Sequence, residues 1–109
     1  VNISGGILEG RKISALAEAS GRLCIPHTWT NGLGLAANLQ LIGALTNCPY
    51  VEFPYEPPAW TEEVRDIILK EPIKIDKDGF VEIPKKTGLG VELNEELIAK
   101  YTFDKRVIP

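Results

Sequence analysis

The first 54 residues alternate between helix-like and strand-like segments joined by short connections, and this order restricts the possible fold more than any other feature. Apolar residues at helical spacing, such as Ile13, Leu16 and Ala17, predict helices, and short apolar runs bounded by glycine or proline predict buried strands. In chain order we predict a helix over Leu8–Ser20, a strand over Arg22–Pro26, a helix over Gly34–Leu45 and a strand over Tyr50–Phe53. Such alternation is typical of the α/β class, in which helices cover parallel strands.

The chain changes character after Pro54, because prolines at positions 57 and 58 interrupt regular structure again. In this second part we predict a short helix capped by Thr61 with Val64, Ile67 and Ile68 facing inward, a hairpin with its turn at Asp78–Gly79, and a final helix capped by Asn94. We therefore divide the chain into residues 1–58 and an extension over residues 59–109.

Composition excludes several classes of function. With 109 residues the chain is long enough for one small domain, and its net charge of −3 does not argue for a nucleic-acid partner, which would need a basic face. No apolar run approaches the length that crosses a bilayer. Cys24 and Cys48 have no metal-like spacing, so we expect buried thiols in a reducing, cytoplasmic protein. The chain begins with Val1 and contains no methionine, which leads us to expect a processed chain or the C-terminal piece of a longer protein.

His27 and Glu52 are the two candidates for chemistry, and they occupy equivalent places at the ends of the two predicted strands. Histidine exchanges protons near neutral pH, although a lone histidine at a strand end is more often structural. Glu52 interrupts an apolar run, which indicates either a functional buried carboxylate or a strand end that already faces solvent. Because neighbouring parallel strands end at the same edge, the two side chains could share a pocket.

Two other motifs are better explained by structure than by ligand binding. The stretch "NGLGLAAN" (residues 31–38) lacks the full spacing of a phosphate loop, so we interpret Gly32 and Gly34 as a tight turn. Asp76 and Asp78 lack the remaining ligand positions of a calcium loop and indicate a solvated hairpin turn.

Three stretches taken together resemble one known family: "SGGILEGRKISALAEASGRLCIPHTWTNGLGLAANLQLIGAL", "YVEFPYEPP" and "KKTGLGVELNEELIAKY". Their order and spacing are similar to the C-terminal end of the enolase superfamily, in its mandelate racemase/muconate-lactonizing branch and especially its acid-sugar dehydratases. The resemblance implies a modified (β/α)7β barrel. Residues 1–58 would supply its last helices and strands, and residues 59–109 would return to the capping domain.

The resemblance also implies the chemistry. In that family Mg²⁺ binds the substrate carboxylate, a base removes the proton from the neighbouring carbon, and the metal stabilises the enediolate. His27 matches the family's histidine at the end of the seventh strand and would be the base, or the acid that helps a β-hydroxyl leave as water. Glu52 matches the acid after the eighth strand, which hydrogen-bonds the intermediate, and Trp29 would line the substrate pocket. A cytoplasmic homo-oligomer acting on a small-molecule carboxylate is implied.

The chain departs from the family pattern where the metal should bind. No part of it corresponds to the carboxylate ligands of the third to fifth strands, and the aspartate that orients the histidine would fall just before Val1. We therefore expect this chain alone to be inactive and poorly folded, with no metal ligands of its own. Two alternatives stay open: racemisation or cycloisomerisation on the same scaffold, and a small α/β binding module without catalysis.

Overall fold

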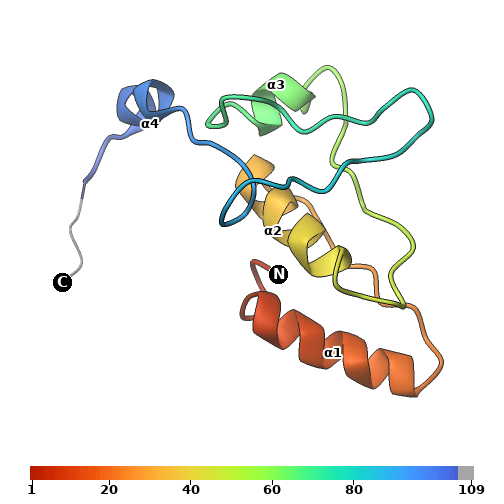
Figure 1. The fold of residues 1–109 in the computed structure, drawn as a ribbon. Coiled ribbons are helices and arrows are strands. Elements are labelled where there is room, and N and C mark those ends of the chain that lie inside the picture. Colours follow the sequence, from red (N-terminus) through yellow and green to blue (C-terminus); the bar gives the residue numbers. More distant parts are fainter. Residues whose placement is uncertain (106–109) are drawn as a thin grey trace.

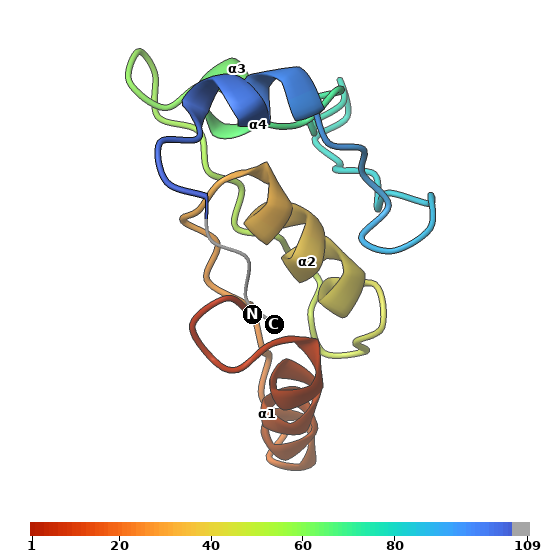
Figure 2. The same ribbon diagram turned by 90° about the vertical axis from the view of Figure 1, so that its left-hand side faces the viewer.

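The computed structural model describes residues 1–105, and this part of the chain contains four helices. They are α1 (Ile7–Ala19), α2 (Gly32–Ile42), α3 (Glu62–Arg65) and α4 (Glu95–Tyr101). In both ribbon views α2 lies in the middle, with α1 on one side and α3 and α4 on the other (Figures 1 and 2). All four predicted helices are therefore confirmed, with ends that shift by a few residues. The last four residues of the predicted extension, 106–109, lie outside the described part.

Helix α2 begins two residues before the predicted start. Asn31 is its N-cap, and the side-chain Oδ1 of Asn31 accepts a hydrogen bond from the backbone N–H of Gly34 at 3.2 Å. The prediction of a tight turn at Gly32 and Gly34 is wrong, because both residues belong to the first helical turn. Both glycines are buried, and a Cβ at Gly32 would meet the side chains of Asp66 and Leu69. Close packing, rather than turn geometry, accounts for Gly32.

Helix α1 packs on α2 through small residues. Gly10 and Ser14 are the buried positions of α1, and the side chain of Leu41 occupies the space that a Cβ at Gly10 would need. The apolar residues that identified this helix in the sequence are much more open, with Ile13 at 49% and Leu16 at 72% exposure. The helical period of α1 was therefore predicted correctly, but the face that contacts α2 is the small-residue face.

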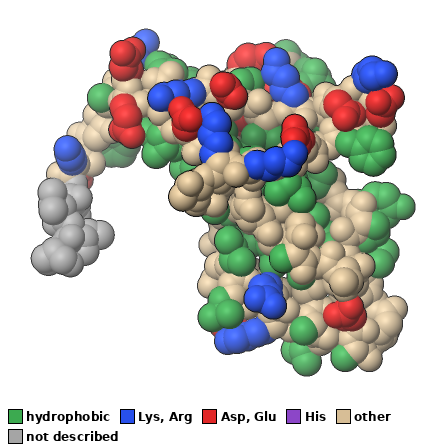
Figure 3. All heavy atoms as spheres, in the orientation of Figure 1, with side chains coloured by type: hydrophobic (Ala, Val, Ile, Leu, Met, Phe, Trp, Pro, Cys, Tyr) green, Lys and Arg blue, Asp and Glu red, His purple; other side chains and the backbone are tan. Residues whose placement is uncertain are grey.

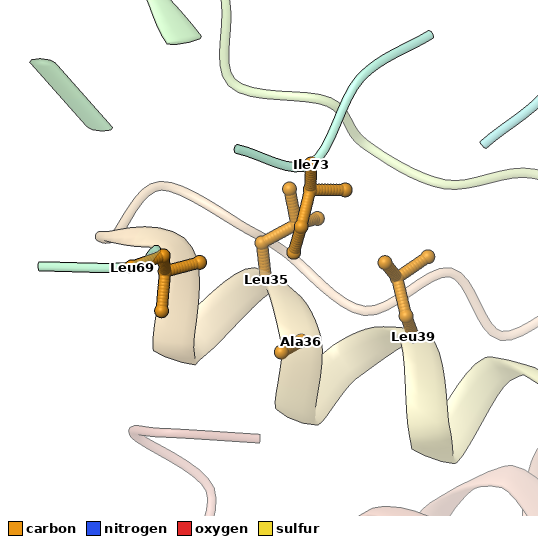
Figure 4. Packing of buried hydrophobic residues seen from close by; sticks show 5 residues of the cluster. All are labelled: Leu35, Ala36, Leu39, Leu69 and Ile73. Carbon is orange, nitrogen blue, oxygen red and sulfur yellow. The ribbon is translucent and has the colours of Figure 1, made fainter. Parts of the chain in front are cut away.

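The hydrophobic core lies between α2 and the C-terminal extension. Leu35, Ala36 and Leu39 project from α2 and meet Leu69 and Ile73, which come from the segment after α3 (Figure 4). All five are at most 7% exposed. Full burial of a leucine or isoleucine side chain contributes about 1.5–3 kcal/mol, so this contact is the main apolar attachment of the extension to α2. Partly buried side chains surround it: Leu33, Val51, Phe53, Val81, Leu89, Val91 and Leu93.

The two predicted strands are the main correction. Within residues 1–105 the segments 22–26 and 50–53 form no β-ladder. The backbone N–H of Cys24 donates to the carbonyl of Asn47 at 3.0 Å, and farther along Thr28 N–H meets the side chain of Glu52 instead of a backbone carbonyl. A strand requires backbone partners along its length, and the Cys24 bond goes to Asn47, outside the predicted strand over residues 50–53.

The predicted short helix of the extension buries its polar side rather than its apolar side. Val64 and Ile67 are 45% and 39% exposed, whereas Arg65 and Asp66 are 0% and 3% exposed, so the predicted inward face is wrong for Val64 and Ile67. Ile68, the third predicted residue, is half-buried. The reason is an ion pair between Arg65 and Asp66, described below. Thr61 is the N-cap residue of α3 but makes no capping hydrogen bond through its side chain.

The remaining turn and cap of the extension follow the prediction. The hairpin has one antiparallel bridge, Ile75 with Val81, and Gly79 has φ +87° in its turn. Asn94 caps α4, since its Oδ1 accepts from the N–H of Leu97 at 3.1 Å. On the surface, acidic and basic side chains alternate over this part of the chain (Figure 3). Among the helices of the described residues, none has the length and apolar character needed to span a bilayer.

Candidate active site

His27 and Glu52 are in direct contact. The Nδ1 atom of His27 lies 2.8 Å from Oε2 and 3.1 Å from Oε1 of Glu52. The predicted neighbourhood of the two segment ends is therefore confirmed, even without a β-ladder between them. Both side chains are accessible from solvent, at 70% for His27 and 36% for Glu52. Of the two alternatives for Glu52, the structure supports a partly solvent-facing carboxylate at a segment end.

The contact with Glu52 makes the two ring nitrogens of His27 chemically different. An ionised glutamate offers only acceptor oxygens, so the Nδ1 atom that faces Glu52 has to carry a proton. In a neutral imidazole the other nitrogen, Nε2, is then the unprotonated one. Glu52 thus fixes the tautomer of His27 and leaves Nε2 as the atom able to accept a proton. This is the same relation that an aspartate has to its histidine in hydrolytic triads.

Two residues that the sequence analysis missed hold this pair in place. The backbone N–H of Thr28 donates to Oε2 of Glu52 at 2.6 Å. Asn38, on α2, donates from Nδ2 both to the backbone carbonyl of His27 at 3.1 Å and to the hydroxyl of Thr28. Thr28 and Asn38 are 0% and 2% exposed. Asn38 could have been found in the sequence, because it is a polar residue inside an otherwise apolar helix.

A cavity of about 310 Å³ adjoins the pair. His27 and Trp29 both line it, together with apolar side chains from α1 and α2 that include Ile13 and Leu41. Glu52 is not among the described residues of its wall, so the two candidates share a contact but not one pocket wall. Trp29 is 47% exposed, which leaves its ring available to a ligand in this space.

The thiols of the chain lie on the segments that lead to the two candidates. Cys24 is half-buried, and Cys48 is 8% exposed with Sγ 3.3 Å from the carbonyl of Tyr50. Burial raises the pKa of the Cys48 thiol, because desolvation disfavours the thiolate. The expectation of two buried thiols therefore holds for Cys48 and only in part for Cys24.

The side chains that the structure describes do not offer a site for a metal ion. Over the described range 1–105, histidine, cysteine, aspartate and glutamate side chains form no group of three or more that could hold one. Asp76 and Asp78 lie in the hairpin turn, where the Asp76 carboxylate accepts the N–H groups of Asp78 and Phe80, each at 2.9 Å. These two hydrogen bonds confirm the predicted hairpin turn.

Comparison with known proteins identifies the family. The profile of the family described as "Enolase C-terminal domain-like" matches residues 1–97, and the chain belongs to that family. The chain is similar to the D-galactarolactone cycloisomerase of Agrobacterium fabrum, with 35% identity over 89% of this chain and 26% of that protein. It is also similar to the arabinonate dehydratase of Saccharolobus solfataricus, with 35% identity over 90% of this chain and 25% of that protein.

A solved structure supports the same relationship. The mandelate racemase/muconate lactonizing enzyme from Sulfitobacter sp aligns with a TM-score of 0.74 and 31% identity, over 94% of this chain and 24% of that one. The chain therefore has the fold of a C-terminal portion of enolase-superfamily enzymes. It spans about a quarter of the length of the curated relatives it matches.

Proposed function

We propose that the complete protein is an enzyme that removes the proton α to a carboxylate of an acid sugar and then eliminates the β-hydroxyl as water. The observation that carries this proposal is the contact between His27 and Glu52, which leaves Nε2 of His27 free to accept a proton. Relatives named as dehydratases of sugar acids, such as L-rhamnonate dehydratase of Saccharopolyspora erythraea at 34% identity, support the substrate class.

Each residue has a defined task in this proposal. Nε2 of His27 takes the α-proton, and the electron pair of the broken C–H bond moves into the carboxylate to form an enediolate. The positive charge that arises on the imidazole is stabilised by the Glu52 carboxylate at 2.8 Å. The protonated ring then acts as an acid toward the β-hydroxyl, which leaves as water. Trp29, beside His27 in the cavity wall, limits where the sugar chain can lie.

The position of Glu52 refines the role that the resemblance implied. That role was a hydrogen bond to the intermediate, whereas here one carboxylate oxygen already accepts from Thr28 N–H and faces Nδ1 of His27. The other oxygen, Oε1, lies 3.1 Å from the same nitrogen and carries no second partner in the hydrogen bonds of the site. Glu52 therefore takes the orienting role that the resemblance assigns to an aspartate before Val1, and Oε1 is the oxygen with capacity left for a substrate.

The rest of the catalytic apparatus belongs to parts of the protein beyond this chain. We place residues 1–58 at the end of a (β/α)7β barrel and residues 59–109 in the return to a capping domain. Mg²⁺ would be held by carboxylates that this chain does not contain, so the chain alone would be inactive. We place the complete protein in the cytoplasm, as a homo-oligomer.

Cycloisomerisation is the second candidate reaction. It is favoured by the similarity to the D-galactarolactone cycloisomerase, and by the 33% identity to muconate cycloisomerase 1 of Rhodococcus opacus. Both reactions involve a proton at the α-carbon, so His27 is the candidate base for each of them. The products separate them, since dehydration yields a keto acid and cycloisomerisation conserves the mass of the substrate.

The test is a screen of the complete protein against a library of acid sugars and their lactones, with Mg²⁺ in deuterated water. Mass spectrometry would follow the loss of water and the uptake of solvent deuterium, which dehydration places on the β-carbon when the enol product becomes the keto acid. We expect His27→Asn to nearly abolish deuterium uptake, because asparagine cannot accept the proton. Gln40→Leu, which changes α2 away from the site, is the matched control and should retain uptake. Uptake that persists in His27→Asn would remove His27 from the role of base.

A further inference from the structure

The most completely buried charges of the described chain form an ion pair that the proposed reaction does not use. Arg65 and Asp66 have side-chain exposures of 0% and 1%. The guanidinium donates from Nε to Oδ1 of Asp66 at 2.7 Å and from Nη2 to Oδ2 at 2.6 Å. This two-point geometry is the strongest form of an arginine–carboxylate contact.

The same pair also holds three backbone groups of other segments. Arg65 Nη1 donates to the carbonyl of Pro54 at 3.1 Å, and Nη2 donates to the carbonyl of Ile73. Oδ2 of Asp66 accepts the N–H of Ile73 at 2.8 Å. The guanidinium carbon lies 4.3 Å from the centre of the Phe53 ring, within the range of a cation–π contact. Every nitrogen of the guanidinium therefore has a partner.

These contacts reach both segments of the candidate site. Phe53 and Pro54 directly follow Glu52, so Arg65 fixes the backbone at the point where Glu52 leaves the chain. On the other side, Oδ1 of Asp66 fills the space beside Gly32, at the start of α2 and at the end of the loop that carries His27. One ion pair thus contacts both the segment that carries Glu52 and the end of the loop that carries His27.

Stability alone does not explain such a pair. Replacing a buried ion pair with apolar side chains of similar volume is often neutral or stabilising, because desolvating two charges is costly. What apolar side chains cannot do is hold carbonyl and N–H groups at fixed distances. We propose that Arg65 and Asp66 are positioning residues, which set the separation of His27 and Glu52 from inside the extension. This inference rests on the proposed function for its catalytic consequence.

The experiment replaces the charges together and keeps the volume, in the complete protein. Arg65→Met with Asp66→Leu is compared with Lys85→Met with Glu82→Leu, which removes an exposed ion pair of 2.6 Å from the same extension. Amide hydrogen exchange of Thr28, read by mass spectrometry, reports whether Glu52 still accepts its hydrogen bond. Deuterium uptake by an acid sugar gives kcat and KM, and a melting curve checks folding.

If the pair positions the site, Thr28 exchanges about 10-fold faster in the double variant, because local opening exposes its amide. The kcat should fall about 10- to 100-fold with KM nearly unchanged, since a displacement of about 1 Å is enough for such a loss. The control should change neither. If the double variant does not fold, Arg65→Lys takes its place, since lysine keeps the charge but cannot make the two-point contact.

A folded variant in which Thr28 exchange and kcat both match the wild type would overturn the inference. An effect of equal size in the control variant would overturn it as well, because the site would then respond to any loss of charge in the extension. Failure of the proposed function looks different. In that case no acid sugar takes up deuterium from the solvent when the wild-type protein is present, and the Thr28 amide alone decides whether Arg65 and Asp66 position the loop.

Discussion

Replacement of Asn38 by leucine tests the support of the candidate site most directly. The change keeps a side chain of similar volume inside α2 but removes the Nδ2 donor that serves His27 O and Thr28 Oγ1. The Thr28 hydroxyl still donates to the carbonyl of Pro26 at 3.3 Å, so the group left without a partner is mainly the His27 carbonyl. An unsatisfied polar group of this kind costs about 1–3 kcal/mol.

The matched control is Gln40→Leu on the same helix. Gln40 donates from Nε2 to two backbone carbonyls as well, those of Pro84 at 2.7 Å and Leu89 at 3.2 Å, but both lie in the extension. Urea unfolding of the complete protein, followed by tryptophan fluorescence, should show a free-energy loss of up to about 1–3 kcal/mol for each variant. Only Asn38→Leu should also speed the exchange of the Thr28 amide and lower the rate of α-proton removal.

Two results would refute this reasoning. A change in the unfolding free energy below about 0.5 kcal/mol for Asn38→Leu would mean that its hydrogen bonds are replaced without cost, as at an ordinary surface site. A Thr28 amide that responds equally to Asn38→Leu and Gln40→Leu would mean that α2 transmits any change to the loop. In that second case Asn38 would have no particular role in holding His27.

Two further predictions follow from burial. Gly32→Ala places a Cβ against the side chains of Asp66 and Leu69. Overpacking of this kind should lower the unfolding free energy by about 1–3 kcal/mol in the same urea assay. An unchanged unfolding midpoint would contradict the close contact. Because burial raises the pKa of the Cys48 thiol, its thiolate fraction at neutral pH is small, so iodoacetamide should label Cys24 faster than Cys48. Labelling of Cys48 should rise as the pH is raised. Peptide mass spectrometry measures both rates, and faster labelling of Cys48 at neutral pH would contradict the prediction.

The sequence predicted the features that depend on neighbours along the chain. The periodicity of α1 and α2, the cap at Asn94 and the turn at Asp78–Gly79 are all set by residues within a few positions of one another. The approach of His27 to Glu52 was also predicted, because it follows from equivalent places at successive segment ends. Their catalytic roles stay predictions until the exchange experiment is done.

The features that the sequence did not predict depend on distant partners. Arg65 is buried because Pro54 and Ile73 supply acceptors, and nothing in the stretch around Arg65 reveals them. Periodicity therefore assigned the inward face of α3 to Val64, which is 45% exposed. The two predicted strands failed for a related reason, since an apolar run indicates burial but cannot show whether a hydrogen-bonding neighbour is present along its length.

The core between α2 and the segment after α3 has a consequence for anyone who recombines relatives of this chain. A crossover after residue 58 looks natural from the sequence, but it would join Leu35 and Leu39 of one parent to Leu69 and Ile73 of another. Side chains from two different parents would then meet in this core without having evolved to fit each other. Chimeras should therefore inherit α2 and the segment through Ile73 from a single parent, with the crossover placed before α2 or after the hairpin.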